Sequence, residues 1–365
     1  MQFRFGKYFI YIYQFFRKNI WITLGITSLI LRSLADFNPL FIEKYYSRGL
    51  FPIIRLCFEN SLGLFPIAWI YVFYALAFYA LFRCFRYLFQ KQATYLLRIK
   101  NTIIALLSLA GFLLFGFFFL WGFNYARVPM LTQMDIETQK MDSISLENEL
   151  KIAATETINA RKPLGDTPLS IDTTIINFED NIREDIRQFL GKNSFPNSTG
   201  LRGRCLKPNG ILFGFGISGI YMPYVGESNI DNGLHALEKP FTMAHEMAHG
   251  YGWTEEATAN FVAYLACTQS QDPSTRYSGH LMYFRYVASN YKRNYPKKYM
   301  AFRDTLPVSI LNDMKAINDR QNAFKTWFDT EGVNHVFLNW QGVQGGVRSY
   351  SRVVTLVYSY RNAVK

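Results

Sequence analysis

The chain has 365 residues, of which 50% are hydrophobic, and a formal net charge of +12. Residues 1–125 hold 13 Lys or Arg and only three acidic residues, Asp36, Glu43 and Glu59, so nearly all of the net charge lies there. Basic residues that flank runs of Phe, Leu, Ile and Tyr indicate a membrane protein. A nucleic-acid-binding protein would gather its basic residues on a soluble domain, so no nucleic-acid partner is expected.

Three segments within residues 1–126 are predicted to cross the bilayer. Residues 60–82 and 101–126 contain no charged residue, and each exceeds the roughly 20 residues that a helix needs to span the hydrocarbon core. A further span is expected at residues 19–37, where Arg32 lies near one end and can extend to the membrane surface. No short apolar core precedes a small-residue cleavage pattern, so a cleaved signal peptide is not expected.

The basic loops predict the orientation of these spans. One group lies between the two longer apolar runs, and a second lies at the N-terminus: Arg83, Arg86, Lys91, Arg98 and Lys100, then Arg4, Lys7, Arg17 and Lys18. Both groups are expected in the cytoplasm. The chain is therefore predicted to be a multi-pass inner-membrane protein whose N-terminus is cytoplasmic. Everything after about residue 127 is then periplasmic, and Trp121 and Tyr125 suit the outer interface.

The rest of the chain is predicted to form a polar linker at residues 127–143 and a second domain at 144–365. Helices are expected at residues 145–162, 181–191, 277–291, 309–328 and 348–362. Residues 211–230 combine glycines, β-branched residues and aromatics without helical spacing, which is typical of strands and turns. The fold class predicted is mainly α, with three membrane spans followed by an α+β domain that has a small sheet.

A metal-site motif lies in the middle of this second domain. His245-Glu246-Met247-Ala248-His249 fits H-E-x-x-H, and a helix places residues four apart on one face. Both imidazoles can then bind one Zn²⁺ per chain, while Glu246 acts as a general base toward a water molecule. Apolar neighbours indicate a buried helix, and Gly250 and Gly252 are expected to end it.

Two acidic residues compete to be the third protein ligand. Glu255 fits a metzincin-like spacing after Gly252, although that spacing usually ends in histidine. Glu256 fits a gluzincin-like spacing, in which a second helix carries the acid and Asn260 shares its face. Asn260 could then hydrogen-bond the outer nitrogen of a ligand histidine, so Glu256 is favoured. Thr254 is expected to cap this helix, and Glu255 is then an ordinary first-turn acid.

Other residues support weaker hypotheses. Residues 217–229 could form an edge strand that holds an extended substrate, or simply a structural strand. A side chain that stabilises an oxyanion is expected, and each candidate also has an ordinary structural interpretation: Tyr277, His280, Arg348 and Tyr350. The absence of a C-x-x-C spacing excludes a cysteine-type zinc knuckle. Cys205 and Cys267 could form a disulfide or remain free thiols.

Several blocks of the sequence together resemble a known family. These are "YYSRGLFPIIR", "WGFNYAR", "GIYMPYVGESNI", "PFTMAHEMAHGYG", "EEATANFVAYLAC", "RYSGHLMY" and "GGVRSYSRVVTLVYSY". They are similar to an uncharacterised bacterial family, found mainly in Bacteroidota, of three-span membrane proteins with a gluzincin-like H-E-x-x-H domain. The resemblance implies His245, His249 and Glu256 as zinc ligands and Glu246 as the base. Thr258 departs from the family, since many relatives have a further acid there.

The expected function is that of a membrane-anchored zinc metallopeptidase that hydrolyses envelope proteins or peptides. The alternative is a non-catalytic zinc-binding sensor or scaffold of the envelope, although such a protein has no need of Glu246. An intramembrane protease is disfavoured, because polar stretches at residues 227–239 and 270–276 flank the motif.

Overall fold

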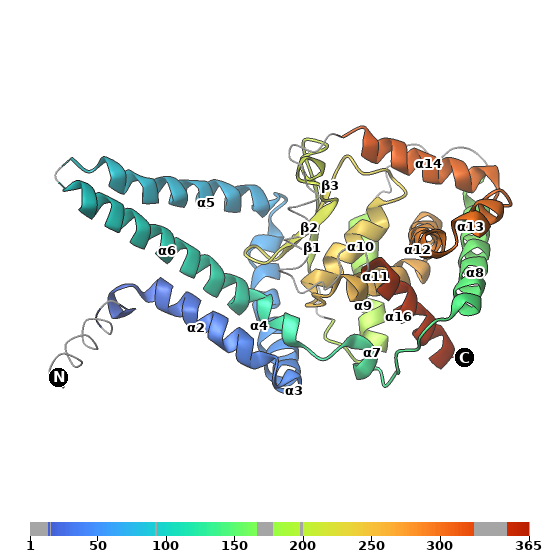
Figure 1. Cartoon of the computed structure of the whole chain (residues 1–365), viewed down its shortest axis with the longest axis horizontal. Coiled ribbons are helices and arrows are strands. Elements are labelled where there is room, and N and C mark those ends of the chain that lie inside the picture. The colour runs from blue at the N-terminus through green and yellow to red at the C-terminus, as the bar shows by residue number, and fades with distance from the viewer. Residues whose placement is uncertain are drawn as a thin grey trace. The chain divides into compact units, whose positions relative to one another are not determined.

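The computed structural model describes residue 14 and residues 16–91, 93–165, 178–197, 200–324 and 349–364. The described chain is mainly helical with one small sheet, and it divides into two compact units (Figure 1). The N-terminal unit comprises residues 1–54, 67–127 and 223–225, and the C-terminal unit comprises residues 55–66, 128–222 and 226–365. The C-terminal unit therefore includes residues 60–66, the first part of the segment expected to span at 60–82.

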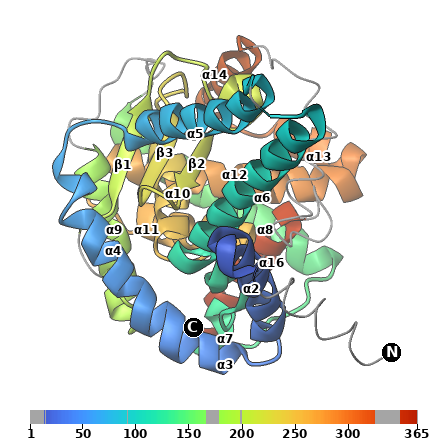
Figure 2. The ribbon, with the colours of Figure 1, turned by 90° about the vertical axis from the view of Figure 1, so that its left-hand side faces the viewer.

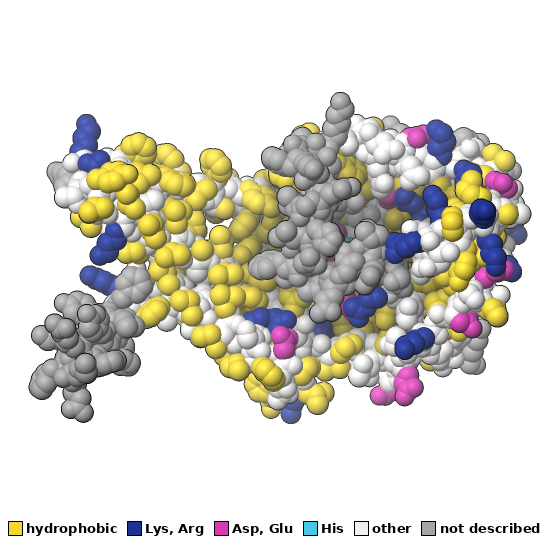
Figure 3. Space-filling view, in the orientation of Figure 1, with side chains coloured by type: hydrophobic (Ala, Val, Ile, Leu, Met, Phe, Trp, Pro, Cys, Tyr) yellow, Lys and Arg dark blue, Asp and Glu magenta, His cyan; other side chains and the backbone are white. Residues whose placement is uncertain are grey.

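The described part of the N-terminal unit is almost entirely helical. Its α-helices are α2 (Ile20–Ala35), α3 (Pro39–Phe41), the first part of α4 (Phe51–Glu59), α5 (Trp69–Phe85) and α6 (Tyr95–Leu120). A π-helix (Ile42–Leu50) joins α3 to α4, and the 3₁₀ helices Arg86–Phe89 and Gly122–Ala126 follow α5 and α6. Trp69–Phe89 and Tyr95–Leu120 are long and apolar enough to cross a membrane. In Figure 3 the surface of these helices is largely hydrophobic.

The helix limits differ from the predicted spans for local reasons. The segment expected at 60–82 is an α-helix only from Trp69, because Pro66 and a 3₁₀ turn at Leu62–Leu64 precede it. The segment expected at 101–126 begins at Tyr95, because the Thr94 side chain accepts a hydrogen bond from the backbone N–H of Leu97.

The segment expected to span at residues 19–37 is interrupted by a bend. α2 has 16 residues, and Asn38 starts a new helix by accepting the backbone N–H of Phe41. The helix axis turns by 113° between Ile20–Ala35 and Pro39–Leu64, and this pair gives a third span only if it is counted as one broken span.

Two glycines allow α2 and α6 to pack closely. A Cβ atom on Gly25 would lie 2.5 Å from the Cα atom of Gly111, and a Cβ atom on Gly111 would lie 2.3 Å from the backbone oxygen of Trp21. No larger side chain fits at either position without moving a helix. Small residues at a crossing point are the usual means by which membrane helices approach each other.

The C-terminal unit combines a three-stranded sheet with helices. Its strands are β1 (Arg202–Leu206), β2 (Gly219–Met222) and β3 (Glu227–Asp231), and its helices are α7 (Met130–Gln133), α8 (Ser143–Arg161), α9 (Phe178–Lys192), α10 (Lys239–Gly250), α11 (Glu256–Thr268), α12 (Pro273–Asn294), α13 (Pro296–Arg303), α14 (Val308–Asn322) and α16 (Ser349–Ala363). The strand order is β1-β3-β2, with β1 parallel and β2 antiparallel to β3 (Figure 2). β2 therefore forms one edge of this sheet.

α10 packs against the sheet and α11 runs through the core. A Cβ atom on Gly203 of β1 would lie 2.4 Å from the sulfur of Met243, so the sheet can approach α10 only because this residue is glycine. Every residue of α11 from Ala257 to Cys267 is buried. Cys205 and Cys267 are both free thiols. α10 and α11, which carry the predicted metal site, are thus fixed by packing on several sides.

Candidate metal centre

α10 positions the two histidines as the motif predicts. Pro240 lies in its first turn, where a missing N–H costs nothing, and the helix ends at Gly250, before Gly252 adopts a positive φ of 83°. The Nε2 atoms of His245 and His249 lie 3.1 Å apart. The buried apolar residues of this helix face the core, namely Phe241, Met243, Ala244, Met247 and Ala248.

Glu256 completes the group from the start of α11. Its Oε2 atom lies 3.2 Å from Nε2 of His245, and its Oε1 atom lies 3.5 Å from Nε2 of His249. Ligands at 2.0–2.1 Å from a tetrahedral zinc ion are separated from one another by about 3.3 Å. The three side chains could therefore hold one such ion without a rearrangement of the backbone.

The neighbouring acid, Glu255, has other partners. Its carboxylate accepts a hydrogen bond from the Thr258 hydroxyl at 2.7 Å and forms an ion pair with Arg352 of α16, also at 2.7 Å. The N-cap of α11 is Glu255 itself, so the expectation that Thr254 caps the helix is wrong. The structure thus brings Glu256, and not Glu255, to the two imidazoles.

The outer nitrogen of each imidazole faces a hydrogen-bond acceptor. Nδ1 of His245 lies 2.9 Å from Oδ1 of Asn260, and Nδ1 of His249 lies 2.8 Å from the backbone oxygen of Trp253. Because both partners accept, each Nδ1 carries the proton in the neutral ring, and each Nε2 presents a lone pair to the centre of the group. Two such lone pairs beside a carboxylate require a cation or a proton between them.

Tyr286 of α12 is a further member of this arrangement that sequence reasoning did not identify. Its hydroxyl donates to Oδ1 of Asn260 at 3.1 Å, so this oxygen accepts from both Tyr286 and His245. No spacing in the sequence links α12 to the motif, and only the packing of helices brings Tyr286 to Asn260.

The charges within the group are strongly coupled. Burial disfavours the charged form of Glu256, but His249 and His245 outweigh this effect and hold its pKa well below the ordinary value. Burial likewise opposes protonation of His249, yet Glu256 and Glu246 raise its pKa to about 9. Without a metal ion, the His249 imidazole is therefore expected to keep a proton near neutral pH.

Glu246 lies beside the group, on the side of the edge strand β2. It is buried, and the backbone N–H of Tyr221 in β2 donates to its carboxylate. A Cβ atom on Gly219 would lie 2.6 Å from Oε1 of Glu246, so the strand can approach this closely only at a glycine. Burial raises the pKa of the Glu246 carboxyl, against the opposing effect of His245 and His249.

The four candidates for oxyanion stabilisation lie in other settings. The Tyr277 hydroxyl donates to Asp313 at 2.7 Å within the core between α12 and α14. Nδ1 of His280 lies 3.6 Å from Glu156 of α8. Arg348 lies outside the described residues. Tyr350 belongs to α16, but its side chain is not among those described. The contacts of Tyr277 and His280 fit structural roles.

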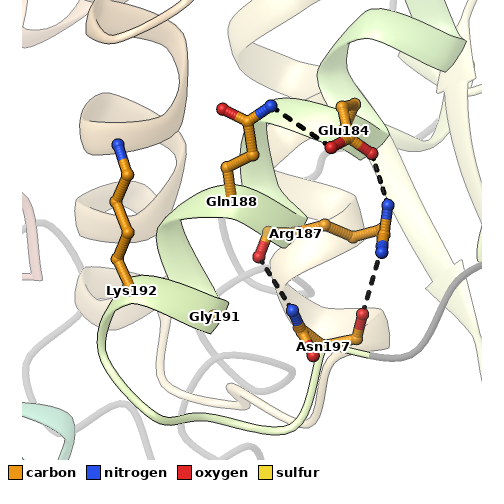
Figure 4. Close-up of a pocket in the computed structure, with 6 residues that line it drawn as sticks. All are labelled: Glu184, Arg187, Gln188, Gly191, Lys192 and Asn197. Atoms are coloured by element: carbon orange, nitrogen blue, oxygen red, sulfur yellow. Dashed lines mark hydrogen bonds and ion pairs between the residues drawn. The ribbon is translucent and has the colours of Figure 1, made fainter.

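A surface pocket lies on α9 (Figure 4). It is lined by Glu184, Arg187, Gln188, Gly191, Lys192 and Asn197, and several of these residues bond to one another. None of the residues of the metal-site group lines it. Among the described residues, His245, His249 and Glu256 are the only group of three or more His, Cys, Asp or Glu side chains placed to share a metal ion.

Comparison with known proteins identifies a family. The family model described as "Protein of unknown function (DUF3810)" matches residues 46–358, and the chain belongs to this family. No curated protein and no solved structure matches the chain. The resemblance to an uncharacterised family is thereby confirmed, and the site has to be interpreted from its own chemistry.

Substitution of the two adjacent acids tests the ligand set. We expect the purified full chain to bind about one zinc ion, as three converging ligands predict. Glu256→Ala should lose most of the zinc, whereas Glu255→Ala, one residue away, should keep it. Metal content measured by inductively coupled plasma mass spectrometry distinguishes the two variants. Retention of the zinc by Glu256→Ala would show that the carboxylate at the imidazoles is not a ligand.

The pH dependence of zinc binding tests the coupled charges. The pKa of His249 is about 9 without metal, and the protonated ring cannot bind a cation, so zinc must displace a proton at lower pH. The zinc affinity should therefore fall by about tenfold for each pH unit below that pKa. Competition with a chelator at several pH values measures it, and an affinity that is constant between pH 6 and 8 would contradict the coupling.

The two residues behind His245 can be tested separately from the ligands. Asn260→Ala should lower the zinc affinity by about 10-fold or more, because the imidazole loses the acceptor that orients it. Tyr286→Phe should have a smaller effect in the same direction. Tyr291→Phe is the matched control, since this hydroxyl lies on the same helix but donates to Glu147. If Tyr286→Phe and Tyr291→Phe bind zinc as tightly as the native chain, Tyr286 does not position the site.

Proposed function

We propose that this protein is a membrane-anchored, zinc-dependent metallopeptidase of gluzincin-like type that hydrolyses peptide bonds in proteins or peptides of the cell envelope. The observation that carries the proposal is the placement of four neighbouring side chains. His245, His249 and Glu256 converge on one point, whereas Glu246 lies next to them and contacts the edge strand. A site that only bound a metal would need the first three residues alone.

The donor set suits zinc. Two imidazole nitrogens and one carboxylate are the three-ligand set of several catalytic zinc sites, which leaves a fourth position open. When bound, zinc would polarise a carbonyl group and lower the pKa of a water molecule. His249 is buried, while His245 and Glu256 are partly exposed, so the group is not sealed from solvent. This partial exposure supports access for a substrate.

Glu246 has the features of a group that accepts and returns a proton. Its carboxylate is buried and its pKa is raised, so the protonated form is easier to reach than for an exposed glutamate. As a base it would take a proton from the attacking water, and as an acid it would pass that proton to the leaving amine. The Tyr221 N–H and the close approach of Gly219 hold the carboxylate in one place during both transfers.

β2 offers a place for an extended polypeptide. It is an edge strand of the sheet, and Glu246 lies against it. A peptide added to such an edge gains backbone hydrogen bonds whatever its sequence, and its carbonyl groups come to lie beside the metal-site group. This geometry favours a peptide or protein substrate over a small molecule.

The membrane attachment follows from the apolar helices, and the orientation from the charged loops. The five basic residues between the apolar runs lie where α5 ends and α6 begins, and no acidic residue accompanies them. Placing this connection in the cytoplasm puts the end of α6, and the domain that follows it, on the periplasmic side of the inner membrane.

Replacing Glu246 tests the mechanism. Glu246→Gln should keep the zinc, because the ligands are intact, but should lower any peptide hydrolysis by about 100-fold or more, since the amide cannot accept a proton. Glu255→Gln is the matched control and should retain activity. The readout is the release of new N-termini from envelope proteins, compared between cells that express the native chain and each variant. Turnover by Glu246→Gln at the native rate would contradict the mechanism.

The same comparison addresses the alternative function. If the native chain binds zinc but no envelope protein changes between native and Glu246→Gln cells, a non-catalytic sensor or scaffold is favoured. Proteins that accumulate uncut in the Glu246→Gln cells would instead identify the substrates.

A further inference from the structure

The helices that follow α2 expose an unusual apolar surface. Residues 37–54 form the end of the α2 turn, α3, the π-helix and the first turn of α4, and we call them the bent segment. Five large apolar side chains of the bent segment are exposed: Phe37 (85%), Leu40 (74%), Phe41 (55%), Tyr45 (55%) and Ile53 (59%). Soluble proteins rarely expose so many large apolar side chains on one short segment without a partner.

The opposite face of the bent segment is buried. Ile42, Tyr46, Phe51 and Ile54 are all buried hydrophobic residues. The segment is thus apolar on both faces, with an inner face that is buried and an outer face that is exposed. Because the inner face already has its partners, the outer face requires a separate explanation.

The charges of the bent segment are distributed unevenly between its faces. Glu43 is buried and pairs with Arg127 at 2.8 Å and with Arg48 at 3.0 Å. Lys44 and Arg48 have exposed positions, and no acidic residue of residues 37–54 is exposed. Apolar side chains interspersed with cations suit a surface that combines acyl chains with anionic headgroups. The same cations disfavour a position in the hydrocarbon core.

The bent segment lies at the level where α6 ends. The Tyr46 hydroxyl donates to the backbone oxygen of Phe119 at 2.9 Å, and Glu43 binds Arg127, just beyond the 3₁₀ helix Gly122–Ala126. With 26 residues at 1.5 Å each, α6 is about 39 Å long, which exceeds the roughly 30 Å of a hydrocarbon core. Its end therefore reaches the membrane surface, where the partly exposed Tyr125 provides an aromatic ring typical of that interface.

We propose that the bent segment is an interfacial helix that lies in the membrane plane, with Phe37, Leu40, Phe41, Tyr45 and Ile53 inserted among the lipids of the leaflet where α6 ends. The 113° turn after α2 directs the chain away from the axis of α2, as such a position requires. The exposed apolar surface also continues along the chain onto Ile30 and Leu34 of α2, so one lipid environment covers both. This proposal does not depend on the metal site.

Site-directed spin labelling of the full chain in lipid nanodiscs tests the proposal. Cysteine is introduced singly at Phe41 or Ile53, in a chain whose four native cysteines are replaced by serine or alanine, and is then labelled. Electron paramagnetic resonance compares collisions with oxygen, which enters lipid, and with a water-soluble nickel chelate. Leu76, exposed on α5, and Lys151, exposed on α8, provide the references for hydrocarbon and water.

The two labelled positions should give an oxygen-to-nickel ratio several-fold above that of Lys151 and clearly below that of Leu76. A ratio equal to that of Lys151 would place the exposed side chains of the bent segment in water and overturn the proposal. A ratio equal to that of Leu76 would place it in the hydrocarbon core, as in a re-entrant span, and would also overturn it.

A second measurement uses the native chain with its cysteines intact. It therefore tests the proposal even if the cysteine-free chain does not fold. A lipid with a photoreactive group at the top of its acyl chain should cross-link to peptides from residues 37–54 of the native chain, as identified by mass spectrometry. Cross-links confined to peptides of α5 and α6 would overturn the proposal.

Discussion

The site depends on two hydrogen bonds that fix which nitrogen of each imidazole carries a proton. Asn260 and the backbone oxygen of Trp253 accept from the Nδ1 atoms of His245 and His249, so the Nε2 lone pairs must face each other and Glu256. This arrangement is unfavourable unless a positive charge occupies the centre. The turn at Gly250 and Gly252, which brings Trp253 back to His249, and the packing of β1 and β3 on α10 all serve to maintain it.

The part of the site that depends on local geometry could be predicted from the sequence. The spacing of His245, Glu246 and His249 predicts their relative positions because all three lie on one helix. Asn260 likewise follows Glu256 by one helical turn. The sequence distinguishes less sharply between Glu255 and Glu256, because a shift of one residue turns a side chain by about 100°. Which of the two carboxylates reaches the imidazoles depends on where α11 begins. The prediction that Thr254 caps this helix was wrong. Tyr286 and β1 could not be predicted, since long-range packing alone brings Tyr286 to Asn260 and pairs Arg202–Leu206 with β3.

In the N-terminal unit, too, local features could be predicted from the sequence and features that depend on long-range packing could not. The sequence predicts the apolar helices of this unit, because the lengths of its uncharged segments can be read from it directly. Their limits depend on single residues such as Pro66, Thr94 and Asn38, whose effects on helix ends compete with hydrophobicity. The bent segment escapes a composition-based prediction because Glu43, Lys44 and Arg48 interrupt its apolar residues. Its two faces separate only when Glu43 pairs with Arg127, 84 positions later in the chain.

We propose that two imidazoles and one carboxylate of this chain hold a single metal ion. X-ray absorption at the zinc edge, recorded on the purified full chain and on His249→Ala, tests it most directly. For the native chain, we expect nitrogen or oxygen ligands at about 2.0 Å, with the outer scattering of two imidazole rings. The variant should show one ring or lose the metal. A native spectrum with sulfur at about 2.3 Å, or with no imidazole scattering, would contradict the account.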